Sequence, residues 1–163
     1  MDRKYLLDSN ILITAHRTLY PFDIAPGFWE QFINKASSRI VMIEQVKKEI
    51  DRGEDELTTW LTDNFDRFEY HRMPSPKVIE SYREIINSIN SNVQYKQSAK
   101  DEFAKIADSW LCAYGLAYNY PILTNEKYKA GARNRVLIPN VCKAFKIEYV
   151  NILDLMRETG FRL

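Results

Sequence analysis

Four acidic residues lie where carboxylates could carry out metal-dependent chemistry. Asp8 directly follows a short apolar run, and Glu126 comes shortly after another. Glu49 and Asp108 lie beside apolar residues inside helical patterns. A carboxylate that faces a core costs several kcal/mol unless it is paired or bound to a metal. If the four carboxylates converge, a divalent cation would offset their repulsion, and oxygen ligands favour Mg²⁺ or Mn²⁺. Such an ion activates water and neutralises phosphate, which are the requirements of phosphodiester hydrolysis.

Each of these acids also has an ordinary structural explanation. Asp8 could be a helix N-cap only, Glu49 a solvated helix residue, and Glu126 a loop acid. Asp108 could instead form an ion pair with one of three basic residues, Lys100, Lys105 or Arg133. Periodicity alone does not bring the four carboxylates together.

The elements that would position these acids alternate between strands and helices. Short apolar runs predict strands at residues 4–7, 39–42 and 121–124, with shorter candidates at 136–138 and 149–150. Helical spacing of apolar residues predicts helices at 11–17, 26–36, 43–50, 57–65, 78–89, 100–119 and 152–158, and Pro139 opens a short one. This alternation predicts an α/β fold with a parallel sheet. In such sheets ligands bind at the carboxyl ends of the strands, where Asp8 and Glu126 lie.

The length and composition favour a single domain over residues 1–163, with ordinary hydrophobic content of 45%. The net charge of +1 argues neither for nor against a nucleic-acid partner. No apolar run approaches the length of a membrane span, so we expect no membrane partner. Cys112 and Cys142 are too few for a disulfide framework, and we expect two buried free thiols in a reducing cytoplasm.

Four segments resemble, in order and spacing, the motifs of PIN-domain nucleases. YLLDSNILI at 5–13 is similar to the first motif, a strand followed by Asp, Ser or Thr, Asn and an apolar helix. VKKEI at 46–50 is similar to the second, an acid on the helix after the second strand. ADSWLCAYG at 107–115 resembles the third, and PILTNEKY at 121–128 resembles the fourth. VLIPNVCKAF at 136–145 is similar to a subgroup of small bacterial and archaeal PIN-like proteins related to VapC-type toxins.

The resemblance implies a Rossmann-like PIN fold with a central parallel sheet of about four to five strands flanked by helices. It also implies an endoribonuclease that depends on Mg²⁺ or Mn²⁺. By position, the metal-binding acids would be Asp8, Glu49, Asp108 and Glu126, while Asn10 would orient the first carboxylate and the Thr124 hydroxyl would support the site. Glu126 departs from the family pattern, which more often has Asp there, and its longer side chain would favour a water-mediated role.

A basic segment follows Glu126 directly and would border the acidic pocket. Between residues 127 and 146 there is no acid, and six residues are basic: Lys127, Lys129, Arg133, Arg135, Lys143 and Lys146. Lysine and arginine neutralise phosphates whatever the nucleotide sequence, so all of these residues but Lys146 are candidates for binding RNA. The alternative is that the segment is an ordinary solvated loop.

Three functions remain open at this point. The first is an endoribonuclease acting on RNA, with a role as the toxin of a toxin–antitoxin pair. Such toxins typically pair with an antitoxin protein, and homodimers are common among them. The second is a PIN-like module that binds RNA or protein without cutting. The third, a phosphatase-like or flap-type DNA nuclease, ranks last because the chain lacks a helical arch insertion and a second DNA-clamping domain.

Overall fold

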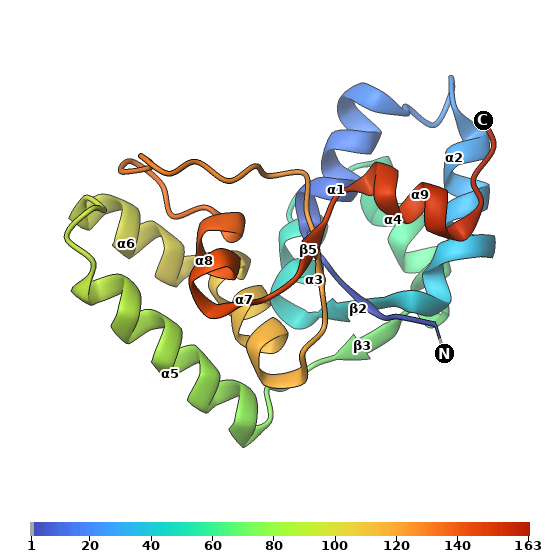
Figure 1. The fold of residues 1–163 in the computed structure, drawn as a ribbon. Helices are drawn as coiled ribbons and strands as arrows, with labels where there is room; N and C mark the ends of the chain where they lie inside the picture. The colour runs from blue at the N-terminus through green and yellow to red at the C-terminus, as the bar shows by residue number, and fades with distance from the viewer. Residues whose placement is uncertain (1) are drawn as a thin grey trace.

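The computed structural model describes residues 2–163, and within them the strands form one parallel sheet (Figure 1). The strand order is β3-β2-β1-β4-β5, and every neighbouring pair is parallel. The strands are β1 (Tyr5–Leu7), β2 (Ile40–Ile43), β3 (Glu69–His71), β4 (Ile122–Leu123) and β5 (Tyr149–Val150). An α/β fold with a central parallel sheet flanked by helices is therefore confirmed.

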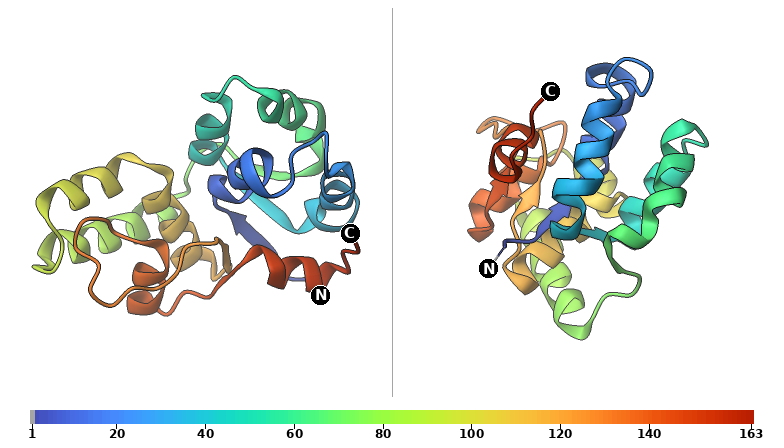
Figure 2. Two further views of the ribbon diagram at one scale, coloured as in Figure 1. Left: turned by 90° about the horizontal axis from the view of Figure 1, so that it is seen from above. Right: turned by 90° about the vertical axis from the view of Figure 1, so that its right-hand side faces the viewer.

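Nine α-helices flank this sheet in the described part of the chain. They are α1 (Ser9–Thr14), α2 (Pro26–Gln31), α3 (Glu44–Asp51), α4 (Glu56–Asn64), α5 (Pro76–Ser91), α6 (Gln97–Lys105), α7 (Ala107–Tyr118), α8 (Ile138–Phe145) and α9 (Ile152–Thr159). Short π-helical turns extend α1 and α2, at Ala15–Leu19 and Phe32–Ala36. Figure 2 shows α5, α6 and α8 grouped on one side and α1 to α4 on the other.

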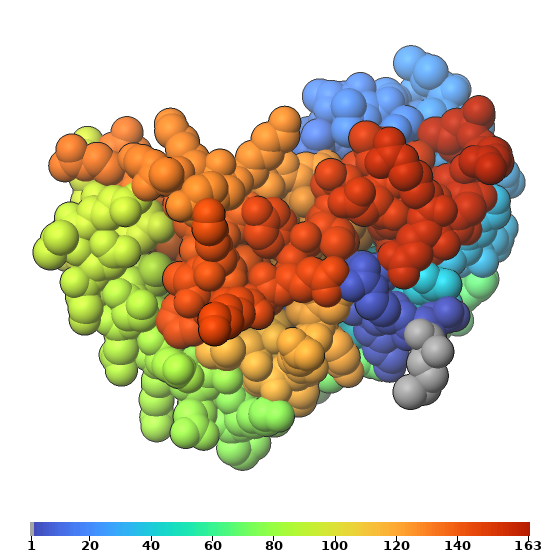
Figure 3. Space-filling view, in the orientation of Figure 1, coloured from blue at the N-terminus to red at the C-terminus, as the bar shows by residue number. Residues whose placement is uncertain are grey.

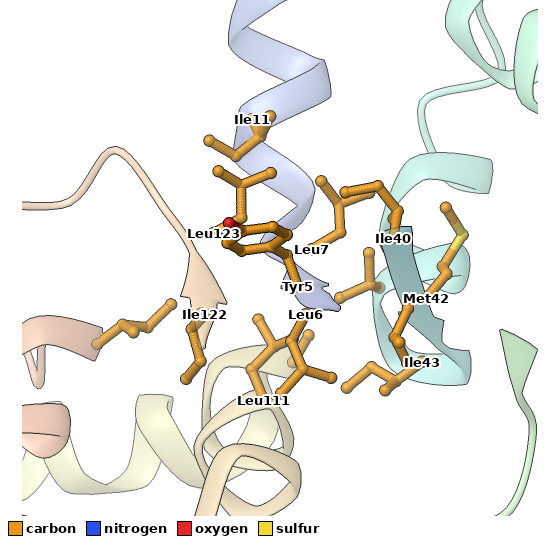
Figure 4. Packing of buried hydrophobic residues seen from close by; sticks show 14 of the residues in the cluster. Tyr5, Leu6, Leu7, Ile11, Ile40, Met42, Ile43, Leu111, Ile122 and Leu123 are labelled. Carbon is orange, nitrogen blue, oxygen red and sulfur yellow. The ribbon is translucent and has the colours of Figure 1, made fainter. Parts of the chain in front are cut away.

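The central strands are apolar throughout because helices cover both faces of the sheet. Every residue of β1, β2 and β4 is fully buried, which explains why these segments read as continuous apolar runs. Figure 4 shows the side chains of β1 and β2 packed with Ile11 of α1 and Leu111 of α7. The edge strands β3 and β5 are partly exposed.

Two predictions about the elements are wrong, and one strand was not predicted. The segment 100–119 is not one helix, because the backbone at Ile106 is extended (φ −102°, ψ 169°) and separates α6 from α7. Residues 136–137 belong to no strand, and Ile138 already starts α8. The strand β3 was not predicted, because three partly exposed residues at a sheet edge give no apolar run.

The strand order fixes where a ligand would bind. From β1 the chain proceeds through β2 to β3 at one edge, and then returns to place β4 on the opposite side of β1. The order therefore reverses between β1 and β4, and in open parallel sheets the crevice at this point is the usual binding site. Asp8 follows β1 and Thr124 follows β4, so both lie at this crevice. Figure 3 shows the orange segment after β4 next to the blue N-terminal helices on the surface of the molecule.

Candidate active site

Asp8 is held at the end of β1 by two hydrogen bonds. Its Oδ1 accepts from the backbone N–H of Asn10 at 3.2 Å, which makes it the N-cap of α1. Its Oδ2 accepts from the Thr124 hydroxyl at 2.8 Å. Asp8 is only 1% exposed. An N-cap alone does not require such burial, so the carboxylate is both a cap and a buried charge at the sheet crevice.

Thr124 connects the ends of the two central strands. While its hydroxyl donates to Asp8, the same oxygen accepts from the backbone N–H of Glu126 at 3.1 Å. The Glu126 carboxylate turns back toward the molecule, where its Oε1 accepts from the Ile138 backbone N–H at 2.9 Å. Glu126 is therefore not a free loop acid: the first turn of α8 holds it beside the crevice.

Asp108 enters the crevice because the helix breaks just before it. The extended backbone at Ile106 makes Ala107 the first residue of α7 and places Asp108 in its first turn. Helix N-termini favour carboxylates, yet Asp108 is 4% exposed. Within the described part of the chain, its buried Oδ2 has no hydrogen-bond partner. A buried carboxylate oxygen without a hydrogen-bond donor is rare in native proteins. The guanidinium of Arg135 lies 3.5 Å from this oxygen and forms an ion pair with it rather than a hydrogen bond.

Glu49, on α3, accepts hydrogen bonds from α1 and from α7 at the crevice. Its Oε1 accepts from the Ala107 backbone N–H at 2.9 Å and so caps α7. Its Oε2 accepts from the hydroxyl of the buried Ser9 in α1 at 2.6 Å. Both carboxylate oxygens are thus engaged, and Glu49 is half-buried rather than solvated. Sequence reasoning did not identify Ser9 as a partner of Glu49, because contacts between α1 and α3 leave no local pattern.

The pKa values of Asp8 and Asp108 are raised, mainly by burial. Burial raises the pKa of Asp8 to about 6, and the charges of Glu126 and Glu49 act in the same direction against its two hydrogen bonds. Burial also raises the pKa of Asp108 to about 8, with added repulsion from Asp8, Glu126 and Glu49, and only Arg135 opposes this. The four carboxylates are therefore close enough for their charges to interact, and the site disfavours the ionised forms of Asp8 and Asp108.

Arg135 lies between two of the four carboxylates. Its Nη2 is 2.8 Å from Glu126 Oε2 and 3.5 Å from Asp108 Oδ2. Asp108 thus forms an ion pair, which was the alternative explanation for this residue, but with Arg135 rather than with Lys100, Lys105 or Arg133. Because Arg135 is about half exposed at 51%, its guanidinium reaches the crevice from the solvent side.

The arrangement is not a ready-made metal cage. Within residues 2–163, no three His, Cys, Asp or Glu side chains are placed to hold a metal ion as they stand. In this arrangement Glu49 turns both oxygens to protein donors, and Arg135 lies against Glu126 and Asp108. An ion would therefore have to displace the guanidinium.

The predicted RNA-binding residues separate into three places. Lys129, Arg133 and Arg135 line one pocket of about 470 Å³. Lys127 lines a second, smaller pocket beside Glu126, and Lys143 lies over the Tyr128 ring with its Nζ 4.1 Å from the ring centre.

Two further predictions are tested by the geometry around the site. Asn10 contacts Asp8 through its backbone N–H while its side chain is exposed, so the asparagine side chain does not make this contact. Cys112 and Cys142 are free and buried, as predicted. Across the described chain, no helix combines the length and the apolar character needed to cross a membrane.

Comparison with known proteins gives a family without an assigned activity. No curated protein matches this sequence significantly. Residues 5–163 match the family described as a domain of unknown function, DUF4411. Since this match covers nearly the whole chain, the protein belongs to the DUF4411 family.

Proposed function

We propose that this protein is a metal-dependent endoribonuclease of the PIN-domain type, which hydrolyses RNA phosphodiester bonds. The observation that carries the proposal is the pair of buried carboxylates, Asp8 and Asp108, at the crevice between β1 and β4. They come from distant parts of the chain and lie beside Glu49 and Glu126. Buried like charges repel one another unless a proton or a cation compensates, and a divalent cation would compensate more than one of them at once.

The donor set fits Mg²⁺ or Mn²⁺. All the candidate ligands are carboxylate oxygens, and Asp108 Oδ2 is buried without a hydrogen-bond donor. Asp8 and Asp108 would hold the ion, and Glu126 would join them once Arg135 leaves it. Bound there, the ion would supply an activated water and neutralise charge on a phosphate.

The protein's own residues would prepare this site. Thr124 holds the Asp8 carboxylate in place, and Glu49 fixes the start of α7 and hence the position of Asp108. Glu49 acts here as a positioning residue, because both of its oxygens already accept hydrogen bonds from the protein. The basic side chains after Glu126 would hold the RNA backbone without reading its sequence.

The direct test compares cleavage of single-stranded RNA by purified wild-type and variant proteins in Mn²⁺. We expect Asp108→Asn to lower the cleavage rate by about a hundredfold or more while the circular dichroism spectrum stays unchanged. Asp101→Asn, at an exposed acid on α6, is the matched control and should cleave like the wild type. Equal cleavage by pure Asp108→Asn protein would refute the proposal, and single-stranded DNA as substrate would separate a ribonuclease from a DNA nuclease.

We further propose that the protein acts as the toxin of a toxin–antitoxin pair. Induced expression of the wild type should then arrest growth of a bacterial host, whereas Asp108→Asn should not. Growth arrest by both proteins, or by neither, would contradict this role. An antitoxin or a second copy of the chain would be the protein partner.

A module that binds RNA or protein without cutting it is the second candidate. It is favoured by the contacts of Arg135 and Glu49, which occupy carboxylate oxygens that a metal ion would need. Calorimetric titration with Mn²⁺ separates the two candidates. Absence of binding tighter than about 1 mM would favour the module.

A further inference from the structure

The pocket lined by Lys129, Arg133 and Arg135 has a fourth cation from a different part of the chain. Lys96, at the start of α6, lines the same pocket of about 470 Å³. Among the described residues that line it, there is no acid. A concentration of positive side chains around one concave space attracts an anion, and Lys96, Lys129 and Arg133 supply this charge while Arg135 is paired with Glu126 and Asp108.

The backbone around this pocket is fixed before any ligand arrives. The Lys96 N–H donates to the Arg133 carbonyl at 3.0 Å, which joins the two walls. The Gln94 side chain donates to the carbonyls of Ala130 at 2.9 Å and Ala132 at 2.6 Å. Residues 124–137 have no helix or strand, and such long irregular segments in compact domains are usually functional when they are held in place.

Arg135 joins the pocket to the carboxylate crevice. It lines the pocket, and its guanidinium also contacts Glu126 and Asp108. An anion in the pocket would therefore lie within the length of one arginine side chain from the proposed metal site. The backbone phosphates of a nucleic acid fit this arrangement. They repeat at short intervals along the chain, and they form strong hydrogen bonds with both arginine and lysine.

We propose that this pocket binds the phosphate next to the scissile one, with Lys96 and Arg133 as its principal ligands. The inference rests on the proposed nuclease function and adds a binding position that the acidic crevice does not provide. A volume of about 470 Å³ lies within the range of pockets that hold nucleotide-sized ligands. Lys96 was not a candidate from the sequence, because it lies outside the basic segment.

The test measures binding of a fluorescently labelled single-stranded RNA by anisotropy, in EDTA so that no cleavage occurs. We expect the double variant Lys96→Gln/Arg133→Gln to weaken binding at least about tenfold and to lower the salt slope by about one. The control Lys77→Gln/Arg83→Gln removes equal charge from exposed positions on α5 and should stay within about threefold of the wild type.

Two results would overturn the proposal. Equal loss in both double variants would mean that general charge, rather than the pocket, attracts the RNA. Unchanged binding in the pocket variant would mean that the RNA lies elsewhere. This binding measurement needs neither metal nor cleavage. If RNA binding depends on the pocket but the protein does not cleave RNA, the nuclease function is refuted while the pocket remains an RNA-binding site.

Discussion

At the scale of single residues, the site is defined by carboxyl groups whose burial opposes their ionisation. The pKa of Asp108 is raised to about 8 and that of Asp8 to about 6, both mainly by burial. At neutral pH these pKa values favour the protonated form of Asp108 in the metal-free protein. A divalent cation would have to replace that proton, which links metal affinity to pH.

The raised pKa values predict a pH dependence of stability with a definite sign. Between pH 4 and 8 the folded state binds more protons than the unfolded state, because unfolded aspartates ionise near pH 3.8. The contribution of these two groups to the free energy of unfolding of the metal-free protein should consequently be largest below pH 4. This contribution should be lost as the pH rises through 6 to 8. Asp108→Asn should flatten the upper part of this decline and, at pH 8, stabilise the protein by about 1–3 kcal/mol.

Urea unfolding in EDTA across this pH range measures the effect. Asp101→Asn, at an exposed acid, is the control and should follow the wild-type pH profile. The account would be contradicted if the wild type lost stability on acidification through pH 6 and if Asp108→Asn did not stabilise the protein at pH 8. That result would show that Asp108 is ionised in the folded protein and that its charge is compensated by its neighbours.

Arg135 should compete with a metal ion for the carboxylates. Its guanidinium contacts Glu126 and Asp108, so its removal should leave both free to bind a cation. We expect Arg135→Gln to tighten Mn²⁺ binding by about tenfold, measured by the rise of the melting temperature with Mn²⁺ concentration. Arg133→Gln, in the same pocket but outside these ion pairs, should leave the Mn²⁺ dependence unchanged. Weaker Mn²⁺ binding in Arg135→Gln would instead mean that Arg135 supports the site.

At the scale of the elements, the helix break at Ile106 allows Asp108 to reach the candidate site. In a continuous helix over 100–119, Asp108 would lie in the middle of a core-facing stripe without a route to a partner. The observed break places it in the first turn of α7, with its backbone neighbour Ala107 bonded to Glu49. Apolar spacing did not reveal this break, because Phe103 and Leu111 continue the same periodicity on either side of it and are both buried.

Glu49 should contribute to stability through the cap that it provides. Glu49→Ala would leave the Ala107 N–H and the Ser9 hydroxyl without their acceptor, which should cost about 1–3 kcal/mol. Glu49→Gln keeps one acceptor oxygen and should cost less. Urea denaturation of the two variants measures the difference, and an unchanged free energy of unfolding in Glu49→Ala would exclude the capping role.

The sequence predicts the strands of this fold better than the contacts of the site. β1, β2 and β4 were predicted within about two residues, because a buried parallel strand must be apolar throughout. The positions of Asp8 and Glu126 after strands followed from the same runs. The orientation of Glu49 and the approach of Arg135 did not, since both depend on contacts between segments that are distant in sequence.

At the scale of the whole molecule, the strand order unites these features. β1 and β4 are neighbours only because the chain returns from β3 to the far side of β1, which the alternation of elements does not dictate. That return brings Thr124 within 2.8 Å of Asp8 and leads the basic segment from the crevice to α6. The acidic crevice and the phosphate pocket therefore lie side by side on one molecule whose net charge is only +1.

The most direct measurement is calorimetric titration of the metal-free protein with Mn²⁺ at pH 7 and pH 9, in two buffers of different ionisation enthalpy. Saturable binding tighter than about 1 mM is expected, with proton release at pH 7 that diminishes at pH 9, and with binding lost in Asp8→Asn/Asp108→Asn. Absence of saturable binding in the wild type, or equal binding in the double variant, would contradict a divalent-cation site at the end of β1.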